Sequence, residues 1–356
     1  MTHRVRWFSS AGILPGARCA LDVFPRFHQF SPMNHPTGCP RELDSAVDGS
    51  IGLHHSRRRF LDRLAWGTSA VAMAPALRGA LNAVEPFQRQ GPPRLLLSLA
   101  AYSFRDQLQA GQLNLFQFLD FCAAHGCVGA ELTSYYFPKE VDVAFLLRVK
   151  AHAFLRGIVI SGTAVGNTFT HGPGAKRDEE MRLVKQWVDY AAILGAPHIR
   201  VFAGSVPQGL KADEAKRNCI AALEEAGDYA GRKGIWLGVE NHGGIVAEAK
   251  DLVEMVRATR SPWVGVNLDT GNFHTADPYA DLARVAPYAV NVQLKGELRA
   301  RGGKAERTDL SRVARILRDA RYQGFVALEY ESREDPFQAV PRWLAEMKTA
   351  FGGAGV

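Results

Sequence analysis

The sequence predicts an α/β fold, an eight-stranded parallel (β/α)8 TIM barrel, and three observations support this prediction. Short aliphatic or β-branched runs alternate with longer helical patterns from Leu95 onward. The segment from Leu95 to Phe351 has the roughly 250 residues that such a barrel needs. A doubly wound open sheet is the competing fold, but the Gly-rich turn that usually follows its first strand is absent from this sequence.

Eight runs have the length and composition of strands. They begin at residues 95 ("LLLSLAAYSF"), 127 ("CVGAELTSYY"), 158 ("IVISGTAVGN"), 198 ("HIRVFAG"), 235 ("IWLGVENHG"), 264 ("VGVNLDTGN"), 289 ("AVNVQLKGE") and 325 ("FVALEYES"). Helical stretches such as "EEMRLVKQWVDYAAILG" lie between them and end in Gly, a common helix stop. We expect a last helix after Asp335.

The first 83 residues differ from the rest of the chain. Residues 1–55 show neither a helical nor a strand period, and we predict a disordered leader there. Residues 56–83 resemble a twin-arginine (Tat) export signal, with Arg57 and Arg58 followed by an apolar stretch too short to span a bilayer stably. An ordinary basic amphipathic helix is the alternative. We therefore assign residues 84–356 to the barrel and expect an exported protein, periplasmic or in the cell envelope, with no stable membrane span in the mature chain.

The charge distribution argues against a nucleic-acid partner. The formal net charge is +7, but residues 1–83 hold ten Arg and no Lys against five acidic residues, so the predicted barrel is nearly neutral. The cysteines of the barrel, Cys122, Cys127 and Cys219, show no metal or redox spacing and are expected to be small buried side chains.

The later strands alternate strictly between two kinds of side chain. In residues 288–297, "YAVNVQLKGE", aliphatic residues alternate with Asn291, Gln293 and Lys295. One face of a barrel strand packs under the helices and the other points into the barrel. We assign the polar phase to the interior. This assignment brings one polar residue from each of four strands to the carboxyl end of the barrel: Glu240, Asp269, Gln293 and Glu329.

These four residues form a predicted metal site. Three carboxylates that converge in a partly desolvated space repel one another, and a divalent cation removes that conflict. Gln293 adds a neutral oxygen. An all-oxygen donor set favours Mn²⁺ or Mg²⁺ over Zn²⁺. The alternative is a polar interior in which Arg200 and Lys295 neutralise the carboxylates through ion pairs.

The stretches "GVENHGG", "VNLDTGNF", "VNVQLKGE" and "ALEYE" resemble the sugar phosphate isomerase/epimerase family, the xylose isomerase-like TIM barrels. The resemblance implies one divalent metal held by Glu, Asp, His and Glu after strands five to eight. Glu240, Asp269 and Glu329 match three of those positions. Gln293 stands where many members have His, and Gly296 stands where many have Asp.

The resemblance implies proton abstraction next to a sugar carbonyl through an enediolate. Glu240 and Glu329 are the expected acid/base pair, in addition to being metal ligands. Transfer on opposite faces of the sugar gives epimerisation, and transfer on one face gives aldose–ketose isomerisation. One alternative is a lyase or hydrolase that cleaves a 3-keto-glycoside after the same proton abstraction, and another is a non-catalytic exported sugar-binding protein. A related nuclease that acts on abasic DNA is disfavoured, because that branch uses several Zn²⁺ ions and many His ligands.

Seven further residues are predicted to bind substrate, since they share the polar phase or follow the strand ends: His242, Lys295, Asn272, His274, His171, Arg200 and Glu131. For Arg200 and Glu131 an internal salt bridge is the competing role. Phosphorylated sugars are scarce outside the cytoplasm, so we expect a free or oxidised sugar as substrate. The sequence leaves a homo-oligomer open.

Overall fold

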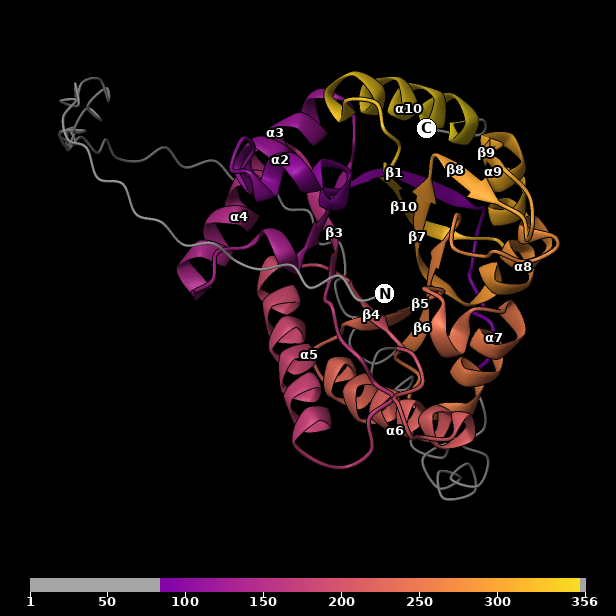
Figure 1. Ribbon diagram of the computed structural model, residues 1–356. Coiled ribbons are helices and arrows are strands. Elements are labelled where there is room, and N and C mark those ends of the chain that lie inside the picture. The colour runs from indigo at the N-terminus through magenta and orange to yellow at the C-terminus, as the bar shows by residue number, and fades with distance from the viewer. Residues whose placement is uncertain (1–83, 353–356) are drawn as a thin grey trace, which may run out of the picture. The chain divides into compact units, whose positions relative to one another are not determined.

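A computed structural model describes residues 84–352, so the predicted leader and export signal lie outside the described residues. Eight parallel strands close into a barrel in the order β1-β10-β7-β6-β5-β4-β3-β2, and helices surround them (Figure 1). The strands are β1 (Arg94–Ala100), β2 (Gly129–Thr133), β3 (Val159–Ala164), β4 (His198–Phe202), β5 (Trp236–Glu240), β6 (Val264–Asp269), β7 (Ala289–Lys295) and β10 (Gln323–Glu329). The predicted (β/α)8 TIM barrel is confirmed.

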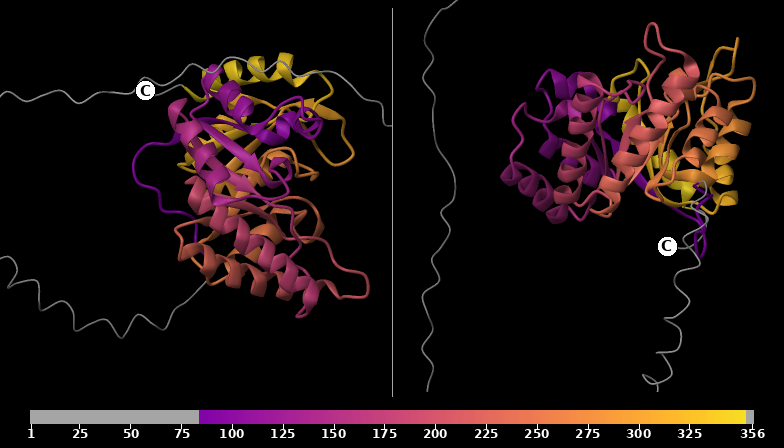
Figure 2. Two further views of the ribbon diagram at one scale, coloured as in Figure 1. Left: turned by 90° about the vertical axis from the view of Figure 1, so that its left-hand side faces the viewer. Right: turned by 90° about the horizontal axis from the view of Figure 1, so that it is seen from below.

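A helix follows each barrel strand before the next one begins, and Figure 2 shows this outer layer from two further sides. The helices are α2 (Arg105–Gln109), α3 (Leu115–Ala124), α4 (Val143–Leu155), α5 (Ala175–Leu194), α6 (Ala212–Gly231), α7 (Ala249–Ala258), α8 (Pro278–Val285), α9 (Leu310–Asp319) and α10 (Pro336–Phe351). Local chemistry sets their ends. Asn114 forms a capping box with Gln117 at the start of α3. Gly195 ends α5 at a φ of 79°, in the left-handed region.

The connection after β7 contains a hairpin that the sequence analysis did not predict. Strands β8 (Glu297–Arg299) and β9 (Ala305–Arg307) pair antiparallel, apart from the barrel sheet. In this hairpin Leu298 is buried, while most of the other side chains are exposed.

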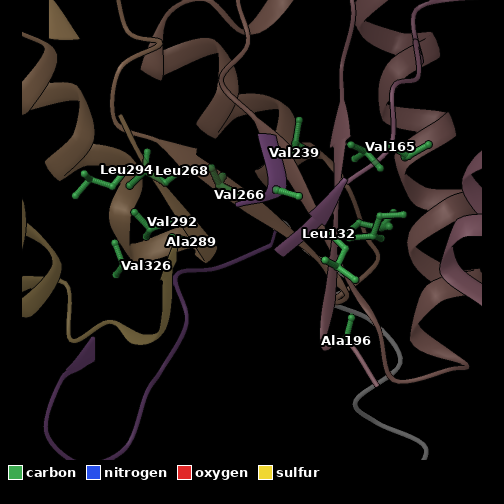
Figure 3. Packing of buried hydrophobic residues seen from close by; sticks show 14 of the residues in the cluster. Leu132, Val165, Ala196, Val239, Val266, Leu268, Ala289, Val292, Leu294 and Val326 are labelled. Carbon is green, nitrogen blue, oxygen red and sulfur yellow. The ribbon is translucent and has the colours of Figure 1, made fainter. Parts of the chain in front are cut away.

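The alternation along the strands separates the core from the barrel interior. The aliphatic phase, which includes Val239, Val266, Leu268, Val292 and Leu294, is buried in the main hydrophobic cluster (Figure 3). The polar phase makes hydrogen bonds across the barrel. Asn291 on β7, for example, donates to Glu131 on β2, and two strands separate β7 from β2 in the closed ring. Such a bond requires both side chains to point inward, so the inward assignment of the polar phase is confirmed for these residues.

Residues before β1 cover the amino end of the barrel. Phe87 packs edge-on against Trp236 at the start of β5, with ring centroids 5.0 Å apart. The Arg89 guanidinium lies between the rings of Phe87 and Tyr322, 5.0 and 4.9 Å from their centroids. The carboxyl end is therefore the candidate entrance for a ligand. Over the described part of the chain, no helix combines the length and hydropathy that a membrane span requires.

Candidate active site

Four strands end in a charged residue at the open end of the barrel. Glu240, Asp269, Lys295 and Glu329 are the last residues of β5, β6, β7 and β10. Because parallel strands end at the same rim, these side chains meet there. Together with Arg200 of β4 they form what we call the mouth cluster. Each of the five side chains is buried, with at most 8% of the residue exposed.

Two cations pair with the carboxylates of the mouth cluster. Lys295 Nζ lies 2.9 Å from Glu329 Oε2 and 3.4 Å from Asp269 Oδ2. It also lies 2.9 Å from Oε2 of Glu331, a more exposed residue beyond the strand. Arg200 Nε lies 2.9 Å from Glu240 Oε2. Arg200 thus forms an internal ion pair with Glu240, and Glu131 has other partners.

The surroundings separate the pKa values of the two predicted acid/base residues. Burial raises the pKa of Glu240 to about 8; Arg200 opposes this shift, and the charges of Asp269 and Glu329 reinforce it. Burial acts in the same direction on Glu329, but Lys295 outweighs it and leaves the pKa of Glu329 below its usual value. Burial also raises the pKa of Asp269 to about 7 against the effect of Lys295. Glu240 is thus suited to donate a proton and Glu329 to accept one at neutral pH.

Gln293 lies one step deeper, in a second group that we call the inner cluster: Glu131, His198, Asn267, Asn291 and Gln293. Gln293 Nε2 donates to Glu131 Oε1 (2.5 Å), and Gln293 Oε1 accepts from Asn267 Nδ2 (2.6 Å). Asn291 Nδ2 donates to Glu131 Oε2 (2.7 Å) and to Asn267 Oδ1 (2.8 Å). The two hydrogen bonds of Gln293 hold both ends of its amide, so its orientation is fixed.

The predicted donors fit a divalent cation in their chemistry. Asp269 Oδ2 is buried and accepts no hydrogen bond from any described residue. Gln293 Oε1 accepts one hydrogen bond and retains a second lone pair. Within residues 84–352, however, no three or more His, Cys, Asp or Glu side chains are spaced to hold a metal ion. In this arrangement Lys295 and Arg200 supply the positive charge that the carboxylates require.

The other predicted substrate-binding residues lie at different distances from the mouth cluster. Asn272 Nδ2 donates to Glu240 Oε1 (2.9 Å). The exposed His242 ring packs against the Phe202 ring, with 4.4 Å between the ring centroids. The Arg200 guanidinium also contacts the Phe202 ring, 4.0 Å from its centroid. His274 lies farther out, with Nδ1 3.4 Å from the carbonyl oxygen of Arg299. His171 lies on the loop before α5 and makes no hydrogen bond or ion pair with the cluster among the described residues.

Sequence reasoning missed three residues of this region. Glu331 forms an ion pair with Lys295. It could have been predicted, because it stands two residues after Glu329 and so continues the same alternation. His198 is buried with Nε2 3.8 Å from Glu131 Oε2, and it shares the inward phase of Arg200 on β4. The Tyr136 hydroxyl is buried without a hydrogen-bond partner among the described residues, and burial followed by nearby Tyr102 and Glu329 raises the pKa of Tyr136. Tyr136 lies in a 3-10 turn after β2. The strand alternation does not extend into this turn, so it could not predict the direction of the Tyr136 side chain.

Solved structures with the same architecture include two sugar epimerases. A D-psicose 3-epimerase from Clostridium cellulolyticum H10, solved with D-tagatose, is 14% identical, with a TM-score of 0.58 over 73% of this chain and 92% of that one. The 3-keto-D-glucoside 4-epimerase of E. coli, solved in its apo form, is 16% identical, with a TM-score of 0.56 over 72% and 99%. The IOLI protein, solved with a bound zinc atom, is 17% identical, with a TM-score of 0.58 over 72% and 96%. At these identities the likeness shows the fold.

No curated protein sequence matches the chain significantly. The family model described as "Xylose isomerase-like TIM barrel" matches residues 119–347, more than half of the chain. That match spans β2 to α10 and includes every residue of both clusters. The chain therefore belongs to the xylose isomerase-like TIM barrel family.

Proposed function

We propose that the protein is a sugar isomerase or epimerase that removes and returns a proton at the carbon beside a carbonyl, through an enediolate. Glu240 and Glu329 are the two proton-transferring carboxylates. The observation that carries the proposal is their placement at the mouth, each beside its own cation. Membership of a barrel family whose solved relatives include sugar epimerases supports the reaction class.

The two carboxylates lie on well-separated walls of the barrel. Glu240 ends β5 and Glu329 ends β10, and β6 and β7 lie between them in the ring. A sugar held over Asp269 would present one face to each carboxylate. Because one group can then remove the proton and the other can return it to the opposite face, this placement favours epimerisation.

Neighbouring side chains prepare each carboxylate for its role. Lys295 holds Glu329 in its ionised form and can donate a hydrogen bond to a substrate oxygen that gains charge. Arg200 and Asn272 both contact Glu240 and fix its orientation. Burial of the cluster strengthens the electrostatic interactions of its charged side chains.

A divalent metal belongs to the proposal. Glu240, Asp269, Glu329 and the side-chain oxygen of Gln293 would hold it, and this all-oxygen set favours Mn²⁺ or Mg²⁺. A bound metal would polarise the substrate carbonyl and a neighbouring hydroxyl. Elemental analysis of protein purified without chelators tests this point, and we expect about one divalent ion per chain.

The test of the reaction is solvent exchange. We expect keto- or aldo-sugars incubated in deuterated water with the protein and Mn²⁺ to gain deuterium at the carbon beside the carbonyl, as detected by proton NMR. Release of an aglycone from 3-keto-glycosides would instead support the cleaving enzyme, a second candidate for which a cavity beside Lys295 offers space. Binding of sugars without exchange in any of them would contradict the proposal and support a non-catalytic binding protein.

We further propose that the protein is exported before it acts, on the strength of Arg57 and Arg58 and the apolar stretch after them. Its substrate is then a free or oxidised sugar. Replacing both arginines by Lys should retain the full-length protein in the cytosol. Equal distribution of the wild type and this variant between cell fractions would contradict export by this signal.

A further inference from the structure

A cavity of about 350 Å³ opens beside the mouth cluster, above the end of β7. Its lining comes from the end of β7, from the loops after β6 and β10 and from the β8–β9 hairpin, and it includes Gly271, Lys295, Glu297, Arg299, Ala305 and Glu331. Lys295 belongs to both sites, because its Nζ contacts Glu329 on one side and Glu331 on the other. A ligand at the mouth can therefore extend into the cavity past a single side chain.

Several contacts fix the outer wall of the cavity. Thr308 closes the base of the hairpin onto β7, with its hydroxyl donating to the Lys295 carbonyl (2.6 Å) and its N–H to the Gly296 carbonyl (2.9 Å). Arg307 on β9 contacts two residues of α10. Its guanidinium carbon lies 4.0 Å from the centroid of the Trp343 ring, and its Nη2 lies 2.6 Å from Glu346 Oε2. The hairpin is thus attached at its base and to a neighbouring helix, as a preformed binding wall requires.

The floor of the cavity depends on close packing at Gly271. A Cβ at this position would lie 2.6 Å from Lys295 Cγ and 2.9 Å from the Glu297 carbonyl oxygen. The absence of a side chain lets the loop after β6 lie directly against the end of β7. The cavity consequently begins at the Lys295 side chain, within reach of a group attached to the reacting sugar.

The lining matches hydroxyl groups better than a phosphate. Glu297 and Glu331 supply acceptors, Lys295 and Arg299 supply donors, and these two acids and two bases balance in charge. Lys295 is already shared by three carboxylates, and Glu297 accepts a hydrogen bond from Ser332 (3.1 Å). A dianionic group would be repelled by Glu297 and Glu331, whereas a sugar hydroxyl can donate to a carboxylate and accept from a cation.

We propose that this cavity is a second subsite that binds a neutral sugar unit linked to the reacting sugar, so that the substrate is a disaccharide or a similar glycoside. The proposal rests on the proposed function for the position of the reacting ring. The volume of the cavity is near the lower end of the range for ligand sites, and it suits one additional small unit and not a long chain.

Calorimetric titration of the full protein, supplied with Mn²⁺, tests the subsite without requiring turnover. The probes are fructose, fructose 6-phosphate and four disaccharides that carry a second hexose at O3, O4 or O6 of fructose: turanose, lactulose, maltulose and palatinose. We expect at least one disaccharide to bind about tenfold more tightly than fructose, because the second ring adds hydrogen bonds in the cavity.

A pair of variants locates the gain. Ala305→Trp places a bulky ring in the cavity and should abolish the advantage of the disaccharide while leaving fructose binding unchanged. Glu306→Trp adds the same ring at the next hairpin residue, which does not line the cavity, and should preserve the advantage. Circular dichroism of both variants establishes that they are folded.

Three results would overturn the subsite: no disaccharide binding more tightly than fructose, a gain that survives Ala305→Trp, or a gain for fructose 6-phosphate alone. The outcome is separable from the proposed function. Tight disaccharide binding without deuterium exchange in any sugar would retain the subsite and reject the isomerase, and exchange without a disaccharide advantage would do the reverse.

Discussion

The two polar clusters inside the barrel lie only a few residues apart along the same strands, yet they are built in opposite ways. The inner cluster surrounds one carboxylate, Glu131, with the amide donors of Asn291 and Gln293. The mouth cluster brings three carboxylates together with two cations. In the inner cluster, amide hydrogen bonds compensate the buried charge of Glu131. In the mouth cluster, the carboxylates and cations lie at the open end, where a ligand can contact them.

The carboxylates of the two clusters also differ in how completely they are hydrogen-bonded, although His198 Nε2 and Asn291 Oδ1 of the inner cluster have no hydrogen-bond partner among the described residues either. Glu131 is fully buried and both of its oxygens accept hydrogen bonds. In the mouth cluster Asp269 Oδ2 accepts none from the described residues, and Glu329 and Lys295 keep 5% and 8% exposure. A satisfied buried group contributes to stability, and a partly satisfied one at an opening is typical of a functional site. The comparison therefore predicts that changes in the two clusters have different consequences.

The largest effect is expected at Glu329. Glu329→Gln removes the proposed base, so the rate of deuterium exchange should fall by about a thousandfold. The free energy of unfolding should change little, because Lys295 retains Glu331 and Asp269 as partners. Exchange rates measured by NMR and urea unfolding monitored by circular dichroism check both statements. The control is Glu331→Gln, which loses an equivalent 2.9 Å contact with Lys295 and should keep most of the exchange of a monosaccharide, because Glu331 lines only the neighbouring cavity. Equal losses in the two variants would contradict the assignment.

The next largest effect is a loss of stability in the inner cluster. Glu131→Leu leaves the buried amides of Asn291 and Gln293 without their acceptor and should lower the free energy of unfolding by about 3 kcal/mol. Urea unfolding measures it. Ser98→Ala, which removes one buried hydroxyl contact of 2.8 Å with Ser161, is the matched interior change and should cost about 1 kcal/mol. If the Glu131 variant were no less stable than the Ser98 variant, the inner cluster would not have the structural role assigned to it.

A smaller loss of activity is expected at Lys295. Lys295→Met keeps the length of the side chain but removes the cation beside Glu329, and kcat should fall by about a hundredfold. Steady-state kinetics on the sugar that exchanges fastest provides the measurement. Lys250→Met, which removes an exposed ammonium that lies 3.7 Å from Glu254, controls for loss of a surface charge. Wild-type activity in the Lys295 variant would show that the cation has no part in the reaction.

The smallest effect is expected outside both clusters, at the hairpin. Arg307→Gln removes an exposed ion pair and a contact with Trp343, so the free energy of unfolding should fall by less than about 1 kcal/mol. Urea unfolding again checks it, with Arg342→Gln on the surface of α10 as a comparable change. A loss of several kcal/mol would show that the hairpin belongs to the folding core of the barrel.

Strand periodicity predicted most of what one strand determines alone. The eight strands, the inward polar phase and the placement of Glu240, Asp269 and Glu329 at strand ends follow from alternation and from the common rim of parallel strands. The hairpin was missed because its strands have three residues each and mostly exposed side chains, which leaves no periodic signal.

Partner choice inside the barrel was beyond the sequence. The alternation predicted that Gln293 points inward like Asp269. Only the closed ring brings Gln293 on β7 to Glu131 on β2, with β10 and β1 between them. The sequence named no single carboxylate for Arg200, and its pairing with Glu240 depends on the register that places Phe202 opposite Glu240. Such contacts join residues far apart in the chain and depend on strand register, which no single strand encodes.

One measurement tests the division between the clusters most directly: the rate of solvent-deuterium exchange into a keto-sugar, per folded molecule, in Glu329→Gln and Glu131→Gln side by side. The Glu329 variant should lose exchange at full stability. The Glu131 variant should be less stable but retain exchange to within about tenfold, since a Gln oxygen can still accept from Gln293. Full exchange in the Glu329 variant, with loss of exchange confined to the Glu131 variant, would show that the catalytic and structural roles are not divided between the clusters in this way.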